Sequence, residues 1–427
     1  MTSLQSLPDA ATLDATDPLR ALRSEFRIPI APDGRESVYF CGHSLGLQPQ
    51  SAAALVAEEL DAWSRLAVEG HFRGPRPWVP YHEQLTPGFM QLTGSGRGEV
   101  VAMNSLTVNL HLLCVSFYRP TRERPKLLIE RSAFPSDRYA AESQVRFHGF
   151  DPERALIEVG PRPHEDILRM DDLAEVIERE GRKIALVLLP GVQYLTGQWY
   201  DIAELTRIAR AQGCRVGVDL AHAIGNVPLA LHDWGVDFAV WCTYKYLNGG
   251  PGSIGGAFVH ERHARSFDLP RFAGWWGHDG RTRFKMGPQF VPTPGAEGWQ
   301  LSNPPVLAMA PLIASLELFG RAGMPALRQK SLALTGRLER LVNERLAGQV
   351  TIVTPADPER RGCQLSLRLH RPHDEARAVH DRLVDQGVFC DWREPDVIRA
   401  APVPLYNTFA DVDRFVGALE RALIARQ

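Results

Sequence analysis

Hydrophobic and polar residues alternate along the middle of the chain in a pattern that predicts strands separated by helices. Five short apolar runs are typical of buried strands: KLLIE (126–130), ALIEVG (155–160), IALVLLPGV (184–192), RVGVDLAH (215–222) and DFAVWCTYKY (237–246). Helical spacing lies between them, for example in SDRYAAESQVRF and in DIAELTRIARAQG, which ends in a glycine. Continuous apolar strands between helices predict a mostly parallel sheet that is covered on both faces.

The N-terminal region has a weaker pattern. Residues 18–26 predict a short amphipathic helix, and VYFCGHSLGLQPQ predicts a short strand, a glycine-rich turn and a proline stop. Beyond this point, Leu55, Val56, Leu60, Trp63 and Ala67 recur at helical spacing, which predicts a helix with one buried face.

The pattern changes again near residue 303. Two long helical segments, PPVLAMAPLIASLELFGRAG and ALRQKSLALTGRLERLVNERLAG, lead into CQLSLRL, the helix DEARAVHDRLVDQG, the strand VFCDWR and the terminal helix DVDRFVGALERALIAR. These segments predict a smaller α+β domain. We therefore expect an N-terminal arm (1–50) that packs with the small domain, a large domain (51–305) and a small C-terminal domain (306–427).

Composition narrows the class of protein. The 427 residues carry 48 basic and 50 acidic side chains, so the net charge of −2 creates no field that would attract nucleic acid or a membrane surface. The six cysteines are scattered, without a CxxC pair, which fits a reducing compartment. The N-terminus has no apolar signal core, and no long apolar run predicts a membrane span. We expect a soluble, cytoplasmic protein.

The glycines at 250–255 match the pattern GxGxxG, with Asp268 at a distance that imitates a ribose-binding acid. A dinucleotide-binding loop must open a helix, whereas this segment runs into GAFVHERH, a strand pattern. The pattern therefore favours a turn between strands. His260 and His263 form HxxH, but no third ligand lies close in sequence, and we expect no metal site.

Lys245 and Asp219 stand where two successive predicted strands end. In a parallel sheet these ends lie side by side, at the edge where open α/β sheets bind ligands. Pyridoxal phosphate requires such a pair: a lysine for its aldehyde and a carboxylate that keeps the pyridine nitrogen protonated. Each residue alone has an ordinary explanation, since a strand-end lysine can extend to water and an aspartate can cap a helix. Together they favour pyridoxal phosphate as the cofactor.

Several segments, taken together, resemble kynureninase, a fold-type I pyridoxal-phosphate enzyme of the aminotransferase class V type. In chain order they are FCGHSLGLQP, MNSLTVNLHLL, FPSD, DLAHAIGNVPLALHDWGVDFAVWCTYKYLNGGPGSIGGAFVHERH, GWWGHDGRTRFKM, QLSNPP and IRAAPVPLYNTF. The resemblance runs from near residue 38 to the C-terminus. It implies an α/β fold of the fold-type I transferase class, with a large domain built on a mostly parallel, helix-covered sheet and a smaller α+β domain.

The resemblance also implies roles for particular residues. Lys245 matches the lysine that binds the cofactor covalently, Asp219 the partner of the pyridine nitrogen, and Tyr244 a proton donor that also contacts the cofactor. The other matching cofactor positions are Leu106, Thr107, Phe134, Asp137, His222, Trp275 and Asn303. Pro190 stands where eukaryotic members have a serine that contacts the cofactor, and proline cannot make that contact.

Four residues match substrate-binding positions. Arg399 corresponds to the arginine that holds the α-carboxylate, a task that suits its planar, bidentate guanidinium. Ser44, His71 and Asn303 match positions that line the aryl pocket of eukaryotic members, which favour 3-hydroxykynurenine. Some bacterial members that favour kynurenine differ at the His71 and Asn303 positions, so the preference stays open here.

The reaction implied is hydrolytic cleavage of the Cβ–Cγ bond of L-kynurenine or 3-hydroxy-L-kynurenine. Its products are anthranilate or 3-hydroxyanthranilate and L-alanine, in tryptophan catabolism or NAD biosynthesis. A homodimer is also implied, in which Trp275 and Asn303 reach the neighbouring subunit's cofactor. Two alternatives stay open: a related enzyme, such as a cysteine desulfurase or an aminotransferase, and a catalytically silent binding module. Cys363 leads directly into a predicted strand, which argues against the mobile cysteine that a desulfurase needs.

Overall fold

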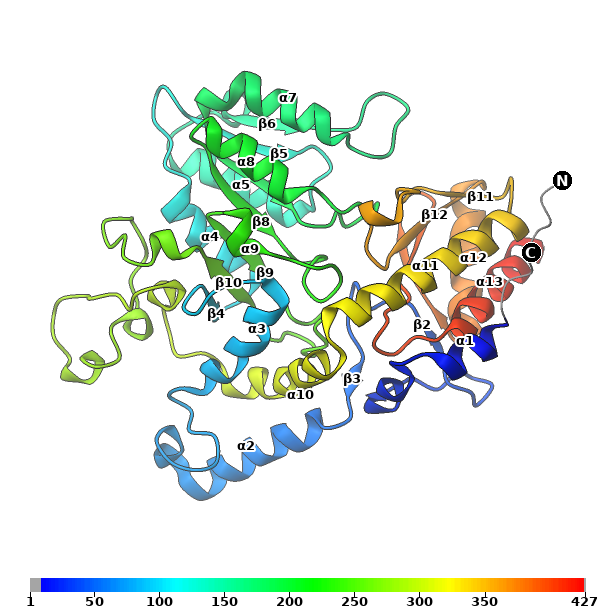
Figure 1. Ribbon diagram of the computed structural model, residues 1–427, viewed down its shortest axis with the longest axis horizontal. Helices are drawn as coiled ribbons and strands as arrows, with labels where there is room; N and C mark the ends of the chain where they lie inside the picture. Colours follow the sequence, from blue (N-terminus) through cyan, green and yellow to red (C-terminus); the bar gives the residue numbers. More distant parts are fainter. Residues whose placement is uncertain (1–8, 426–427) are drawn as a thin grey trace.

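The computed structural model describes residues 9–425 and is built around a seven-stranded sheet (Figure 1). In spatial order the strands are β4 (Val100–Ala102), β10 (Gly256–Val259), β9 (Phe238–Trp241), β8 (Arg215–Asp219), β7 (Ile184–Pro190), β5 (Lys126–Glu130) and β6 (Leu156–Val159). Neighbours from β9 to β6 are parallel, while β10 is antiparallel to both of its neighbours. The predicted mostly parallel sheet is confirmed.

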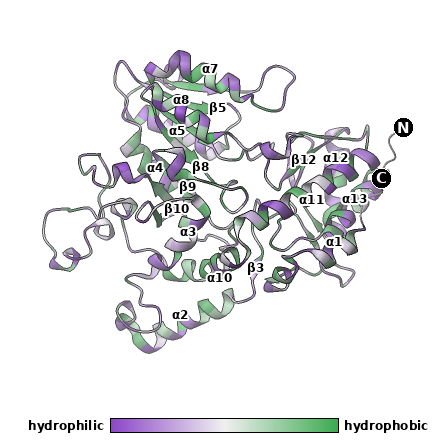
Figure 2. Cartoon of the chain, viewed as in Figure 1, coloured by the Kyte–Doolittle hydropathy of each residue, from purple (hydrophilic) through white to green (hydrophobic). Residues whose placement is uncertain are grey.

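Helices cover both faces of this sheet. On one face, Leu127 and Ile129 of β5 share a hydrophobic cluster with α4 (Leu106–Phe117) and α5 (Pro135–Phe147). On the other face, Leu128 belongs to a cluster with α3 (Thr86–Thr93), α7 (Met170–Glu180), α8 (Ile202–Ala211) and α10 (Val306–Ala322). Successive strand residues point to opposite faces, so a strand buried on both must be apolar throughout. Figure 2 shows hydrophobic residues gathered on these strands.

A second sheet organises the C-terminal part. Its four antiparallel strands lie in the order β11 (Val350–Ile352), β12 (Leu365–Leu369), β15 (Val397–Ala400) and β14 (Asp391–Arg393). The helices α11 (Met324–Arg345), α12 (His373–Asp385) and α13 (Phe409–Ile424) contribute to its separate core. VFCDWR, expected as one strand, is two, because β13 (Val388–Phe389) pairs with β2 (Val38–Tyr39) instead of joining this sheet.

The arm before residue 50 lies against this C-terminal part (Figure 1). Residues 1–8 of the predicted arm, and 426–427 of the C-terminal domain, lie outside the described residues. Asp14 of α1 (Ala10–Thr16) accepts hydrogen bonds from the backbone N–H groups that open α13. Lys330 and Asp17 form a buried ion pair at 2.8 Å. The expected helix at 18–26 is a 3-10 helix, Arg20–Glu25, and α1 precedes it.

Two features differ from the sequence-based expectations. The hydrophobic cores do not divide at residue 306, because α10 packs on α2 (Ala52–Leu66) and α3 and belongs to the larger core. The predicted buried face of α2 is only partly covered: Leu55 and Val56 pack against the larger core, whereas Leu60 is 45% exposed and Trp63 is 61% exposed. Helical periodicity identifies an apolar stripe, but not what covers it.

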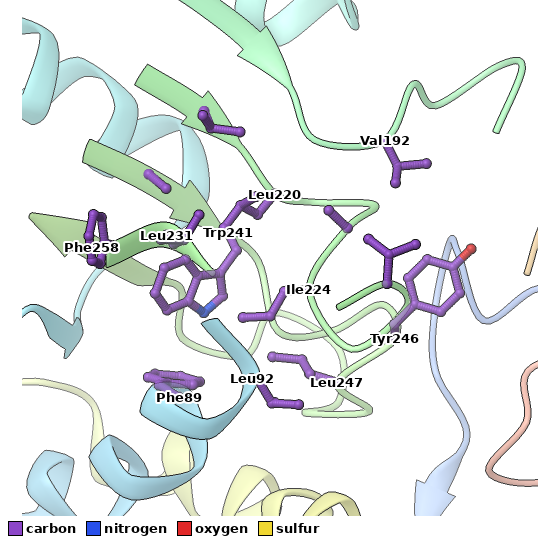
Figure 3. Close-up of a cluster of buried hydrophobic side chains, with 14 of the residues drawn as sticks. Phe89, Leu92, Val192, Leu220, Ile224, Leu231, Trp241, Tyr246, Leu247 and Phe258 are labelled. Atoms are coloured by element: carbon purple, nitrogen blue, oxygen red, sulfur yellow. The ribbon is translucent and has the colours of Figure 1, made fainter. Parts of the chain in front are cut away.

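Strand β9 ends in a hydrophobic cluster that supports the glycine-rich segment (Figure 3). The ring of Trp241 meets Phe89 edge to face, with centroids 5.2 Å apart. Gly250 and Gly252, with φ values of +90° and +68°, then turn the chain back into antiparallel β10. The prediction of a turn between strands, in place of a dinucleotide loop, is confirmed.

No single helix within residues 9–425 is long and apolar enough to cross a membrane; α10 and α11, bent by 83° between them, reach the necessary length and composition only as a pair.

Candidate active site

Lys245 and Asp219 face one cavity at the carboxyl edge of the central sheet. Asp219 is the last residue of β8, and Lys245 follows the end of the adjacent parallel strand β9. The residues that line the cavity are Leu106, Thr107, Glu130, Phe134, Ser136, Asp137, Pro190, Val192, Tyr194, Asp219, Ala221, His222, Tyr244 and Lys245. Eight of the residues predicted from sequence therefore lie together, although they come from four separate segments of the chain.

Lys245 makes its closest polar contact with His222. Their Nζ and Nε2 atoms are 3.0 Å apart. Burial, followed by the positive charges of Lys245 and Arg399, holds the pKa of His222 well below its usual range. A neutral imidazole can accept a hydrogen bond from the lysine ammonium, so His222 orients Nζ towards the cavity. The Nζ atom also lies 5.7 Å from the centre of the Phe134 ring.

Asp219 and Asp137 form a buried pair of carboxyl groups. Burial and the neighbouring charge of Asp219 raise the pKa of Asp137 well above its usual range. The pKa of Asp219 is also raised by burial, but the N–H of Ala221, 2.6 Å from Oδ1, and the positive charge of Lys245 oppose the rise. Asp219 is therefore the better place for a negative charge, and Asp137 the better place for a proton.

Tyr244 keeps its proton at neutral pH. Burial, followed by the negative charge available at Cys242, raises the pKa of the phenol. Its ring lies 5.9 Å from Lys245 Nζ. The residue can therefore donate a proton but is a weak acid before any ligand binds.

The residues present fit pyridoxal phosphate. Asp137 Oδ1 and His222 Nδ1 are buried without a hydrogen-bond partner, so the cavity holds polar atoms that a ligand would satisfy. Leu106 and Thr107 begin α4, and the free backbone N–H groups at a helix N-terminus suit a phosphate. Lys245 supplies an amine, Asp219 a carboxylate and Phe134 an aromatic face. A larger cavity of about 710 Å³ lies at the starts of α7 and α8, but no lysine lines it.

Arg399 lies next to this cavity without lining it. Its side chain, on β15, is 1% exposed and donates to the carbonyl oxygen of Tyr194 at 2.6 Å. It also donates to Ser44 Oγ at 3.3 Å and forms an ion pair with Asp391. Ser44 thus lies beside the guanidinium, whereas the resemblance assigns it to the aryl pocket.

His71, Asn303 and Trp275 lie apart from Lys245 in this chain. His71 and Asn303 line a different cavity, of about 260 Å³, with Trp63, Trp78 and Trp276. Trp275 is 44% exposed and donates its indole N–H to the carbonyl oxygen of Arg283 at 3.2 Å. The two cavities share no lining residue. Within one chain, the structure does not bring these three residues to the cofactor cavity.

Several residues of the site were missed from sequence. Glu130 and Tyr194 line the cavity, and His43 is fully buried beside Asp391, 3.4 Å from Nε2 to Oδ2. Glu130 ends the apolar run KLLIE, and a charged residue at the carboxyl end of a buried strand is a usable signal. Tyr194 could not be identified from the sequence, because it binds Arg399 through its backbone carbonyl oxygen, a group that every residue type carries.

His260, singled out with His263 in sequence, lies instead with Glu99 and His232. The Glu99 carboxylate accepts hydrogen bonds from the backbone N–H groups of Gly96 at 2.5 Å and Glu261 at 2.7 Å. It also lies 3.0 Å from His232 Nδ1. These contacts fix the position of the Glu99 carboxylate.

Comparisons with known proteins agree with the resemblance. Residues 327–419 match the family model of the kynureninase C-terminal domain. A kynureninase of Koribacter versatilis is 60% identical over 407 residues, 95% of both chains. One of Xanthomonas campestris pv. campestris is 60% identical over 420 residues, 98% of this chain and 99% of the relative.

Solved structures with a similar fold include two enzymes of sulfur chemistry. A mutant of C-DES with glycine covalently linked to its PLP cofactor has a TM-score of 0.75 at 18% identity, covering 93% of this chain and 98% of its own. The cysteine desulfurase CsdA of Escherichia coli has a TM-score of 0.72 at 18% identity, covering 98% and 99%. These likenesses concern the fold, while the close full-length relatives decide the family: the chain belongs to the kynureninases.

Proposed function

We propose that the protein is a pyridoxal-phosphate-dependent hydrolase that cleaves the Cβ–Cγ bond of L-kynurenine or 3-hydroxy-L-kynurenine. The products are anthranilate or 3-hydroxyanthranilate and L-alanine. One observation carries the proposal: Lys245 and Asp219 face the same cavity from neighbouring parallel strands, in a chain 60% identical to kynureninases over nearly its whole length.

When bound, pyridoxal phosphate supplies an aldehyde that condenses with amines and a ring that accepts the electrons of a substrate carbanion. Lys245 Nζ would hold the aldehyde of the cofactor and would move the α-proton of the substrate. Asp219 would keep the pyridine nitrogen protonated, because the hydrogen bond from the N–H of Ala221 favours its negatively charged carboxylate. His222 keeps Nζ directed at the cavity.

The remaining residues bind the substrate and handle later protons. Arg399 holds the α-carboxylate, for which it exchanges part of its contact with Asp391. Tyr244, with its proton retained, donates in the steps after water has attacked the γ-carbonyl and the carbon–carbon bond breaks.

We also propose a homodimer whose interface includes the outer face of α2. Leu60 and Trp63 form an exposed apolar stripe there, next to the cavity that His71 and Asn303 line. An apolar face of this kind favours a protein partner. A second copy on it would bring Trp275 and Asn303 to the neighbour's cofactor cavity, and the aryl pocket would then form between subunits.

A cysteine desulfurase is the second candidate, because solved desulfurases share the fold. Such an enzyme needs a reactive cysteine, and Cys363 is buried, with burial raising the pKa of its thiol to about 12. A buried, protonated thiol is a poor nucleophile.

We also propose that the protein works in the cytoplasm. All six cysteines are free, which fits a reducing compartment.

The test uses the colour of the protein. Purified wild type reconstituted with pyridoxal phosphate should be yellow, and Lys245→Ala should lose that absorbance while its circular dichroism stays that of the folded wild type. A wild type that stays colourless with added cofactor would remove the basis of the proposal.

A further inference from the structure

A short turn connects the cofactor cavity to Arg399. It follows β7 and is closed by hydrogen bonds from Gln193 N to Gln198 O at 2.8 Å and from Gly197 N to Gln193 O at 2.9 Å. Gly197 has a φ of +71°, and a Cβ on it would lie 2.9 Å from the carbonyl oxygen of Gln364. The 193–198 turn is therefore built for close approach to the C-terminal sheet.

Arg399 binds to the outer side of this turn. The Tyr194 carbonyl oxygen accepts hydrogen bonds from Arg399 at 2.6 Å and from Gln364 Nε2 at 3.1 Å. The Leu195 carbonyl oxygen accepts from Gln364 Nε2 and from Ser366 Oγ. The Tyr194 carbonyl is thus one of three groups, with Ser44 and Asp391, that hold the guanidinium in place.

The inner side of the turn is held by the side chain of Gln193. Its Oε1 atom accepts from the backbone N–H groups of Leu195 at 2.6 Å and Thr196 at 2.8 Å. Its Nε2 atom donates to Glu130 Oε1 at 3.2 Å and to the carbonyl oxygen of Ser132 at 3.1 Å. Both the oxygen and the nitrogen of this buried side-chain amide therefore have hydrogen-bond partners.

Glu130 anchors this network to the large sheet. It ends β5, is 3% exposed and lines the cofactor cavity. Its second oxygen accepts a hydrogen bond from the Tyr200 hydroxyl. A chain of contacts thus runs from Glu130 to Gln193 and from Gln193 to the N–H of Leu195. This N–H belongs to the same peptide group as the Tyr194 carbonyl, which accepts from Arg399.

We propose that Glu130 and Gln193 are positioning residues that fix the 193–198 turn and through it the Arg399 guanidinium that takes the substrate α-carboxylate. The inference rests on the proposed function, because it assumes that role for Arg399. It predicts that loss of the Gln193 amide selectively weakens binding of the substrate carboxylate and leaves the affinity for the cofactor unchanged.

The test compares L-alanine with L-alaninamide, which lacks the carboxylate. Their dissociation constants are measured from the absorbance change of the protein loaded with pyridoxal phosphate. In Gln193→Leu we expect the affinity for L-alanine to fall roughly tenfold, the size of a charge-assisted contact that has lost its geometry. The affinity for L-alaninamide should stay within about twofold, because the amide makes no such contact.

Gln198→Leu is the matched control. It is the same substitution in the same turn, but Gln198 Nε2 donates to the carbonyl oxygen of Leu168 at 2.7 Å, away from Arg399. We expect it to leave the ratio of the two affinities unchanged. If Gln193→Leu does not fold, Gln193→Glu serves instead, since it keeps the acceptor for Leu195 and Thr196 but loses the donor to Glu130.

A second measurement does not need the cofactor. Hydrogen exchange at the amides of Leu195 and Thr196 should become faster in cofactor-free Gln193→Leu and stay at the wild-type rate in Gln198→Leu. The inference would be overturned if Gln193→Leu is coloured and cleaves kynurenine but has the wild-type ratio of affinities for L-alanine and L-alaninamide. The proposed function would then still stand. A wild type without colour or hydrolysis would instead defeat the proposed function.

Discussion

Replacing Glu130 by glutamine should change how the stability of the cofactor-free protein depends on pH. Burial raises the pKa of Glu130 from 4.5 to about 7, although hydrogen bonds from Tyr200 and Gln193 oppose the rise. The folded state therefore binds this proton more tightly than the unfolded state does. Between pH 4.5 and about 7 the folded protein loses stability as the pH rises, and above that range the cost is constant.

The size of the effect follows from the shift. At about 1.36 kcal/mol per pKa unit, a rise from 4.5 to about 7 lowers the free energy of unfolding by roughly 3 kcal/mol above pH 7. For 427 residues, an unfolding entropy of about 2.1 cal/mol/K per residue makes this roughly 4 °C in the melting temperature. Glutamine has no charge to desolvate, and its carbonyl can still accept from Gln193.

The assay is the melting temperature of apo wild type and apo Glu130→Gln in steps from pH 4.5 to pH 8. The variant should gain about 4 °C on the wild type across this range. Glu153→Gln, the same change at an exposed position, is the control and should follow the wild type. Parallel curves for wild type and Glu130→Gln would refute the burial of an ionisable Glu130.

Three further predictions concern the site and the assembly. Asp219→Asn keeps the shape but removes the charge opposite Lys245, so kcat for kynurenine should fall by roughly 10²–10⁴-fold in a protein that still binds the cofactor; an unchanged kcat would exclude the role given to Asp219. His71→Ala and Asn303→Ala should each lower the ratio of kcat/KM for 3-hydroxykynurenine over kynurenine, by about tenfold for one lost hydrogen bond, and an unaltered ratio in both would contradict the aryl-pocket assignment. Trp63→Glu should convert a dimer to monomers in light scattering, since it puts a charge on the exposed stripe of α2; a monomeric wild type would disprove the dimer.

Much of the fold could be predicted because the strands are buried on both faces. KLLIE corresponds to β5, and RVGVDLAH contains β8, because continuous apolar runs leave little choice of structure. Pairing across domains was not predictable in the same way. The segment VFCDWR divides between two sheets only because the distant Val38 and Tyr39 supply a partner for β13.

The site shows the same division. Lys245 and Asp219 could be placed together, since parallel topology brings adjacent strand ends to one edge. The Tyr194 carbonyl could not, because a backbone atom carries no signature of residue type. The apolar stripe of α2 predicted a buried face, but one chain leaves Leu60 and Trp63 exposed, and the proposed second subunit would cover them.

The most direct test of the central claim is a count of products. Wild type loaded with pyridoxal phosphate should convert L-kynurenine to anthranilate and L-alanine in equal amounts, and Lys245→Ala should form neither above the uncatalysed rate. A coloured wild type that leaves kynurenine and 3-hydroxykynurenine intact, or Lys245→Ala that turns over like wild type, would contradict the account.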